Sequence, residues 1–286
     1  MNTPRSFKFT QLDVFSAVPL MGNPLAVVHE AEGLSDDTMA AFARWTQLSE
    51  TTFLLPPGAA DLGAGADYRV RIFTPHQELP FAGHPTLGSC HAWLAAGGRP
   101  QQHGMVVQAC AAGLVRIRQQ GQRLAFAAPP LLRGGPLDDA LIDRIVQGIG
   151  LSRADVLRHQ WVDNGPGWCA LQLHTAAQVL AVQPDWAVLG NIKLGLVGEQ
   201  PAGRDAQIEV RALIGLGSSG YEDPVTGSLN ASLAQWLVAA GVLPPRYVAA
   251  QGTVLQRAGR VHVAQQGADL WIGGDVVSCI EGRLML

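Results

Sequence analysis

Hydrophobic and polar residues alternate along several short stretches of the first half of the chain, and longer stretches repeat apolar residues at helical spacing. Alternation over about four to eight residues is typical of strands, whereas apolar residues at every third or fourth position indicate an amphipathic helix. Ser35 is an N-cap before two acids, Pro85 suits a first helical position, and Gly97 follows a helix end. The pattern predicts strands at 12–15, 24–28, 50–55, 68–73, 105–109, 114–118 and 123–128, and helices at 36–47 and 85–96.

The second half of the chain begins after a linker. At Ala128–Pro136, proline and glycine interrupt both the helical and the strand spacing of apolar residues. This segment therefore separates two parts of the chain in which such spacing is present. A helix is predicted at Leu137–Gly150, another is predicted to begin after Ser152, and strands then resume. A last helical pattern begins near Ser228 and ends at Gly241.

The two halves repeat one another at a nearly constant spacing. Three pairs match in order at offsets of 142, 144 and 146 residues: Pro24 with Pro166, Gly83 with Gly227, and Leu114 with Arg260. Ordered matches near half the chain length indicate a duplicated α+β unit, in which mostly antiparallel strands curl around a central helix. We therefore predict two pseudo-symmetric domains, 1–127 and 128–286, with 276–286 crossing back to the first. A small-molecule site is expected in a cleft between them.

Composition narrows the class of protein and its partners. The chain has 286 residues, of which 48% are hydrophobic and 15% charged, so it can form a globular core. A net charge of −3 without a Lys/Arg cluster argues against nucleic acid as a partner. The sequence shows no signal peptide and no apolar run of the ~18 residues that a membrane span needs. Four cysteines without Cys-x-x-Cys spacing fit a reducing cytoplasm.

Gly215, Gly217 and Gly220 form a G-x-G-x-x-G pattern that could be mistaken for a dinucleotide site. Such a site requires the helix to start within the glycines, because the pyrophosphate binds at the helix N-terminus. Here an Asp-Pro pair follows the glycines and the helical pattern starts only near Ser228. We interpret the pattern as a turn and expect no organic cofactor.

The two pseudo-symmetric helices begin with similar tripeptides, Ala82–His84 and Thr226–Ser228. Helix N-termini present free backbone N–H groups and the positive end of the helix dipole. If both starts face one cleft, they can hold a carboxylate or stabilise an enolate-like charge. No metal is expected, because His84 and His91 lack a third residue at metal-ligand spacing.

The chain resembles the PhzF-like phenazine-biosynthesis isomerase family in five ordered segments: VFSAVPLMGNPLAVV, LSETTFLL, VRIFTPHQELPFAGHPTLG, YEDPVTGSLNASLAQWL and QGTVLQRAGRVHV. The resemblance spans residues 8–275 and implies the diaminopimelate-epimerase fold, with two similar domains. The best-known member isomerises trans-2,3-dihydro-3-hydroxyanthranilate by a proton shift, without metal or organic cofactor, as a homodimer. The resemblance implies the same for this chain: an isomerase of a small carboxylate-bearing substrate, acting as a homodimer.

The resemblance also assigns roles to six positions: Glu50, His84, Asp223 and Ser228 as catalytic residues, and Gly83 and Gly227 as substrate-binding residues. Glu50 would remove and return the carbon-bound proton. His84, Asp223 and Ser228 would complete the proton-handling and hydrogen-bonding set, and the backbone near the two glycines would bind the substrate carboxylate. Related epimerases carry a cysteine at each helix start, where this chain has His84 and Ser228, so racemisation by two thiols is disfavoured.

Taken alone, each residue also has an ordinary structural interpretation. A glutamate at a strand start is usually solvated, a histidine or serine before a helix can be a cap, and aspartate before proline is a common turn former. Two other functions therefore remain open. One is a racemase or epimerase that uses Glu50 with Asp223 as a second acid, and the other is a non-catalytic protein that binds a small ligand.

Overall fold

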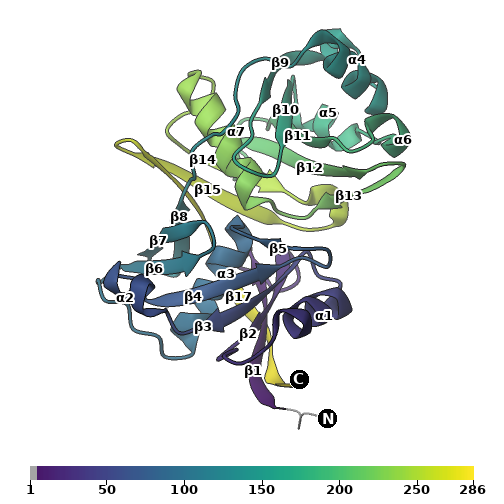
Figure 1. Cartoon of the computed structure of the whole chain (residues 1–286). Helices are drawn as coiled ribbons and strands as arrows, with labels where there is room; N and C mark the ends of the chain where they lie inside the picture. Colours follow the sequence, from purple (N-terminus) through teal and green to yellow (C-terminus); the bar gives the residue numbers. More distant parts are fainter. Residues whose placement is uncertain (1–4) are drawn as a thin grey trace. The chain divides into compact units, whose positions relative to one another are not determined.

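The computed structural model describes residues 5–286, which form two compact units (Figure 1). The chain passes from the first unit to the second after Ala127 and returns to the first after Ile272. The first unit contains the residues up to Ala127 together with Gly273–Leu286, and the second contains Ala128–Ile272. The C-terminal strand belongs to the first unit because it pairs antiparallel with the first strand of the chain, from Ser6 with Met285 to Val14 with Val276.

The first unit is a curled sheet around one helix. It contains β1 (Ser6–Val14), β2 (Asn23–Val28), α1 (Asp36–Thr46), β3 (Glu50–Leu55), α2 (Ala59–Gly63), β4 (Tyr68–Phe73), β5 (Glu78–Leu79), α3 (Gly83–Ala95), β6 (Met105–Cys110), β7 (Gly113–Gln120), β8 (Arg123–Ala127) and β17 (Val276–Met285). β2 pairs parallel with β3 and β4 with β6, while β17–β1–β2, β3–β4 and β6–β7–β8 are antiparallel.

Helix α3 occupies the inside of this curl. Its residues from Gly83 to Cys90 are all buried, and the helix contacts β1, β2, β3 and β8, as expected for a helix whose first two turns are enclosed by the sheet. Gly88 allows the close approach, because a Cβ there would lie 2.4 Å from Cδ2 of Leu25. The opposite face of the sheet packs against α1 through a second apolar layer, in which Phe42 and Phe53 are in edge-to-face contact.

The second unit repeats this plan. It contains α4 (Asp139–Gly148), a 3-10 turn (Arg153–Asp155), β9 (Val156–Trp161), β10 (Trp168–Leu173), α5 (Ala176–Ala181), α6 (Trp186–Leu189), β11 (Lys193–Glu199), β12 (Ile208–Leu216), β13 (Ser219–Asp223), α7 (Gly227–Ala239), β14 (Arg246–Gln251), a second 3-10 turn (Thr253–Leu255), β15 (Gly259–Gln266) and β16 (Asp269–Gly274), of which the last two residues belong to the first unit. β10 pairs parallel with β11 and β12 with β14, while β9–β10, β11–β12–β13 and β14–β15 are antiparallel.

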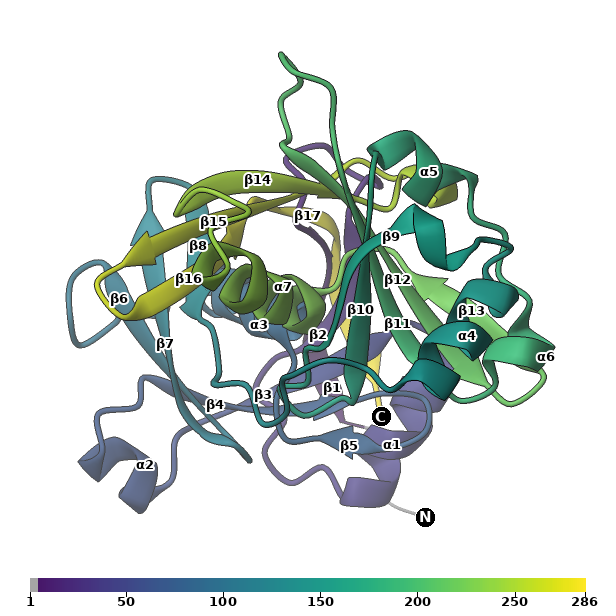
Figure 2. The same cartoon turned by 90° about the horizontal axis from the view of Figure 1, so that it is seen from above.

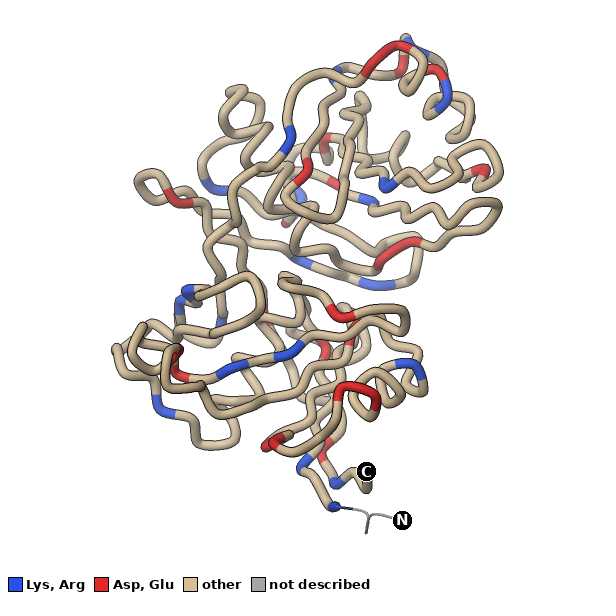
Figure 3. The backbone as a smooth tube through the Cα atoms, in the orientation of Figure 1, with Lys and Arg blue, Asp and Glu red and all other residues tan. Residues whose placement is uncertain are grey.

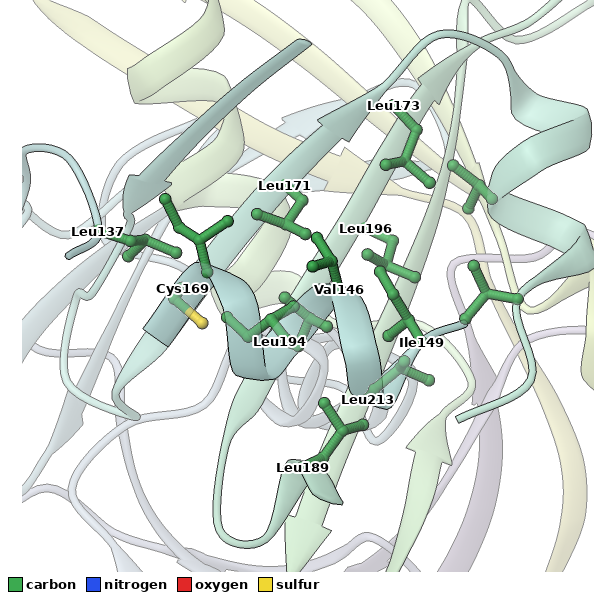
Figure 4. Packing of buried hydrophobic residues seen from close by; sticks show 14 residues of the cluster. Leu137, Val146, Ile149, Cys169, Leu171, Leu173, Leu189, Leu194, Leu196 and Leu213 are labelled. Carbon is green, nitrogen blue, oxygen red and sulfur yellow. The ribbon is translucent and has the colours of Figure 1, made fainter. Parts of the chain in front are cut away.

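The sheet of the second unit has two differently packed faces. α4, α5 and α6 cover the outer face through the cluster of leucine, isoleucine and valine in Figure 4, to which Leu194 and Leu196 of β11 belong. Figure 2 shows these helices on the same side of β10–β12. Gly195, between the two leucines, faces the other way: a Cβ there would lie 2.6 Å from Leu229 of α7. The inner face of β11 is therefore the face toward α7.

The strand registers of the two units can be compared directly. In the first unit Leu25 of β2 lies opposite Glu50 of β3, and in the second Trp168 of β10 lies opposite Lys193 of β11. Both members of the pair differ by 143 residues, close to the offsets found between the two halves of the sequence. Glu50 and Lys193 therefore occupy equivalent positions.

Most predicted elements are present, and one is wrong. The helix expected after Ser152 is only the 3-10 turn, and β9 follows it. Asp155 accepts hydrogen bonds from the backbone and side chain of Ser152, which closes one turn, and the residues from Val156 then pair with β10. α3 starts at Gly83, two residues before Pro85. Proline is tolerated anywhere in the first turn, because the N–H groups of that turn have no partner within the helix.

The glycine pattern at 215–220 lies in a β-hairpin, so no helix starts within the glycines. Gly215 pairs with Gly220 across β12 and β13, and Gly217 has a φ of 72°, which suits the tight turn. α7 begins only at Gly227. Acidic and basic residues are interspersed along the chain (Figure 3). Within residues 5–286 there is no helix long and apolar enough to cross a membrane.

Candidate active site

Glu50 is the first residue of β3, and its side chain lies on the sheet face toward α3. Two residues further on, Thr52 on the same face accepts a 2.9 Å hydrogen bond from Ser89 of α3. Oε2 of Glu50 lies 3.3 Å from Nε2 of His84, and the Glu50 side chain is 16% exposed. Sheet geometry thus brings a shielded carboxyl group to the start of α3.

His84 is a buried, neutral imidazole. Burial lowers its pKa to about 3, against the opposing effect of a hydrogen bond to the backbone of Pro24. The contact with Glu50 is therefore not an ion pair at neutral pH. Nδ1 of His84 is 3.5 Å from Nδ2 of Asn23, whereas Nε2 has no aligned hydrogen-bond partner within residues 5–286. This nitrogen is placed to bond a ligand beside Glu50.

A buried chain of hydrogen bonds holds the start of α3. Tyr68 donates to Gln108 at 2.7 Å, Gln108 donates to Thr86 at 3.1 Å, and Thr86 donates to the Ala82 carbonyl at 2.8 Å. Because Ala82, the N-cap, has no side chain that can accept, the first N–H groups of the helix are not capped.

Asp223 ends β13 and contacts the residue that precedes α7. The hydroxyl of Thr226 donates to Oδ2 of Asp223 at 2.5 Å and accepts from Gln251 at 3.0 Å. Gln251 also accepts from the Thr226 amide and from Nδ2 of Asn230, at 3.1 and 2.8 Å. Gln251 is fully buried, so one glutamine from the strand after the helix fixes this helix start, as Gln108 does in the first unit.

Ser228 is the second residue of α7 and has a defined donor at its side chain. The indole N–H of buried Trp168 donates to Oγ of Ser228 at 3.1 Å, and Nδ2 of Asn164 donates to the Ser228 carbonyl at 3.0 Å. Since Oγ accepts from the indole, the hydroxyl hydrogen of Ser228 is left to point elsewhere. Asn164 and Asn23 have matching roles, because each contacts the second residue of its central helix.

The starts of α3 and α7 differ from those of most other helices in the chain. The helices α1, α4, α5 and α6 each begin with a side-chain cap, provided by Ser35, Asp138, Thr175 and Asp185. Neither Ala82 nor Thr226 caps its helix with a side chain. Uncapped N–H groups at a helix start are donors for an anion.

The predicted site residues fall into two groups. Glu50, His84 and Gly83 meet at the start of α3, and Asp223, Ser228 and Gly227 lie around the start of α7. Within residues 5–286, no group of three or more His, Cys, Asp and Glu residues is arranged to hold a metal ion.

Sequence reasoning missed several supporting residues. Asn23 lies in the Gly-Asn-Pro segment that matches the region of Asn164 in the second half, so the internal repeat could have indicated both. Gln251 opens the segment QGTVLQRAGRVHV and lies 143 residues after Gln108, so the repeat could have indicated it as well. Trp168 gave no such signal, because its role depends on the strand that lies beside α7.

Comparison with known proteins places this geometry in a family. The model of the phenazine biosynthesis-like protein family matches residues 12–282. Antisense-enhancing sequence 1 of Schizosaccharomyces pombe is 32% identical over 98% of this chain and 99% of its own length. Trans-2,3-dihydro-3-hydroxyanthranilate isomerase of Pseudomonas aeruginosa is 29% identical over 96% of this chain and 94% of its own length.

A crystal structure supports the fold. The PhzF-family phenazine biosynthesis protein of Bacillus anthracis superposes with a TM-score of 0.82 at 20% identity, over 99% of this chain and 100% of that protein. Several curated relatives are named isomerases. The chain therefore belongs to the phenazine biosynthesis-like protein family and is an enzyme of the isomerase class.

Proposed function

We propose that the enzyme moves a proton between carbons of a small carboxylate-bearing substrate, without a cofactor, in the manner of a trans-2,3-dihydro-3-hydroxyanthranilate isomerase. Relatives that bear this enzyme's name support the substrate class. The observation that carries the proposal is the 3.3 Å contact between the Glu50 carboxyl group and neutral His84 at the uncapped start of α3.

Glu50 is the proposed base. Its carboxylate takes a proton from a substrate carbon, and the electron pair moves into the conjugated system of the substrate. The same carboxyl group then returns the proton to a different carbon, so no net proton is gained or lost. Because His84 is neutral, no imidazolium charge next to Glu50 weakens it as a base.

The charge that develops on the substrate needs donors that are already in place. The backbone amides near Gly83 and Gly227 are proposed to bind the substrate carboxylate, since neither helix start has a side-chain cap. The hydroxyl of Ser228 is proposed to donate its hydrogen to the substrate, because its oxygen already accepts from the indole of Trp168. Asp223 accepts a hydrogen bond from Thr226, and it is proposed to act with His84 and Ser228 in proton handling and hydrogen bonding to the substrate.

The test is turnover of trans-2,3-dihydro-3-hydroxyanthranilate in heavy water, followed by NMR. Glu50→Gln keeps the shape of the side chain and removes the base, so we expect turnover and carbon deuteration to fall about 10²–10⁴-fold. Glu32→Gln, at an exposed glutamate, is the matched control and keeps the wild-type rate. Circular dichroism of both variants establishes that they fold.

Two results would contradict the proposal. Normal turnover by Glu50→Gln removes Glu50 from the reaction. Deuteration at a single carbon with inversion and no shift of a double bond identifies an epimerase instead.

The oligomeric state and location belong to the same proposal, in which the enzyme is a cytoplasmic homodimer. Light scattering should give twice the monomer mass of 30.3 kDa. A molecular mass equal to that of the monomer at every concentration used in the activity assays would contradict the dimer.

A further inference from the structure

The position equivalent to the proposed base carries a lysine in the second unit. Glu50 lies opposite Leu25, and Lys193 lies opposite Trp168, in the same parallel strand pair of the repeated fold. In the first unit this position reaches the second residue of the central helix, as the contact of Glu50 with His84 shows. The second residue of the central helix in the second unit is Ser228.

The side chain of Lys193 lies on the face of β11 toward α7. Leu194 points to the outer apolar cluster and Gly195 points to Leu229 of α7. Since successive side chains of a strand alternate, Lys193 shares the face of Gly195. Trp168, opposite Lys193 on the neighbouring parallel strand, donates to Ser228 from the same face. Lys193 therefore lies beside the start of α7.

Among residues 5–286, the ammonium group of Lys193 has no anionic partner. Lys193 is half-buried, and none of the ion pairs within residues 5–286 includes it. The acid on the same side of the sheet, Asp223, accepts a hydrogen bond from Thr226. A cation beside a positive helix start is unfavourable unless an anion joins them.

The donors around this place are complementary to a carboxylate. They are the Lys193 ammonium group, the Ser228 hydroxyl and the uncapped amides at the start of α7. We infer that Lys193 is a substrate-binding residue whose ammonium group binds the substrate carboxylate next to Ser228. This assignment rests on the proposed function and deepens it, because it names a residue that binds the anionic group of the substrate.

The chain offers an unusually direct test, since it has only two lysines, Lys8 and Lys193. Reductive methylation with ¹³C-formaldehyde labels both side chains and the N-terminal amine and keeps their charge. Lys193→Met identifies the Lys193 signal by its loss. Anthranilate is the carboxylate probe, and aniline, which lacks the carboxylate, is its matched control.

We expect the Lys193 signal to shift with anthranilate until it saturates, and to stay in place with aniline. The signal of Lys8, which is exposed on β1, should not move with either probe. A Lys193 signal that anthranilate does not move, or that aniline moves equally, overturns the assignment.

Three variants then measure what the charge contributes. Lys193→Met should weaken anthranilate binding about tenfold or more, which is the loss typical of a charge-assisted hydrogen bond. Lys193→Arg retains the cation and should recover most of the affinity, whereas Lys8→Met should bind as the wild type does. Equal affinity of Lys193→Met and the wild type contradicts a binding role.

Failure of this inference differs from failure of the proposed function. If Glu50→Gln loses carbon deuteration but anthranilate leaves Lys193 unmoved, the isomerase proposal stands and the lysine assignment fails. If Lys193 binds the probe but the enzyme shifts no double bond of the substrate, the carboxylate site stands and the isomerase proposal fails.

Discussion

The neutral state of His84 predicts a measurable dependence of stability on pH. Its side chain is 5% exposed, and burial lowers its pKa from 6.5 to about 3. The unfolded chain therefore binds a proton below about pH 6.5 that the folded chain does not bind until near pH 3. The stability that depends on neutral His84 is complete above pH 6.5 and decreases as the pH falls toward 3. At about pH 5 the loss from this one residue is about 2 kcal/mol.

The assay compares wild type with His84→Gln, which cannot titrate. Urea unfolding at about pH 7 and pH 5 gives the free energy of unfolding of each protein under both conditions. The difference between the two pH values should be about 2 kcal/mol smaller in His84→Gln. His29 offers a second case, because it is also buried, bonds Thr10, and has a pKa lowered to about 4 chiefly by burial.

Two results would refute the reasoning. An NMR titration in which the His84 ring of the folded enzyme takes up its proton between about pH 6 and 7 would show that the imidazole is not desolvated. The same pH dependence of unfolding in wild type and His84→Gln would show that the ring is not the source of the effect. Either result would also restore a cation beside Glu50 and change the proposed mechanism.

Two further substitutions test the start of α7. Trp168→Phe removes the N–H that donates to Ser228 while keeping an aromatic ring. We expect about a three- to tenfold loss in kcat/KM, with at most ~1 kcal/mol of lost stability. An unchanged kcat/KM would contradict a role of Trp168 in positioning Ser228. Gln251→Leu leaves Asn230 and a backbone amide without their buried acceptor and should lower the free energy of unfolding by about 2–4 kcal/mol in urea, whereas exposed Gln265→Leu should change it by less than about 0.5 kcal/mol.

The parts of the fold that could be predicted from sequence are those with a local physical cause. Ser35 caps α1 by accepting from Thr38 at 3.2 Å, and two acids follow it. The Gln-Gln-Gly turns of the two matching hairpins both end in a glycine with positive φ, Gly121 and Gly267. These cap and turn residues lie within a few positions of the structure that they specify, so it could be predicted without knowledge of any tertiary contact.

Prediction fails where the structure depends on distant partners. Ser152 and Asp155 form a real helix-start motif, but β10 lies beside the following residues and draws them into the sheet. Trp168 looks like an ordinary core residue until its indole is seen to donate to Ser228. The sequence did not indicate a role for Lys193 either, because its equivalence to Glu50 follows only from the strand registers.

The duplicated scaffold also explains why a single base can suffice. Equivalent positions carry a carboxyl group in one unit and an ammonium group in the other, at Glu50 and Lys193, while the helix starts carry His84 and Ser228. A racemase with two bases needs an acid on each face of its substrate, and a serine oxygen that accepts from an indole does not replace a second thiol. In the proposed reaction one carboxyl group takes and returns the proton, so the second unit needs only to bind charge. In the proposal, the ammonium group of Lys193, the hydroxyl of Ser228 and the uncapped amides of α7 bind that charge.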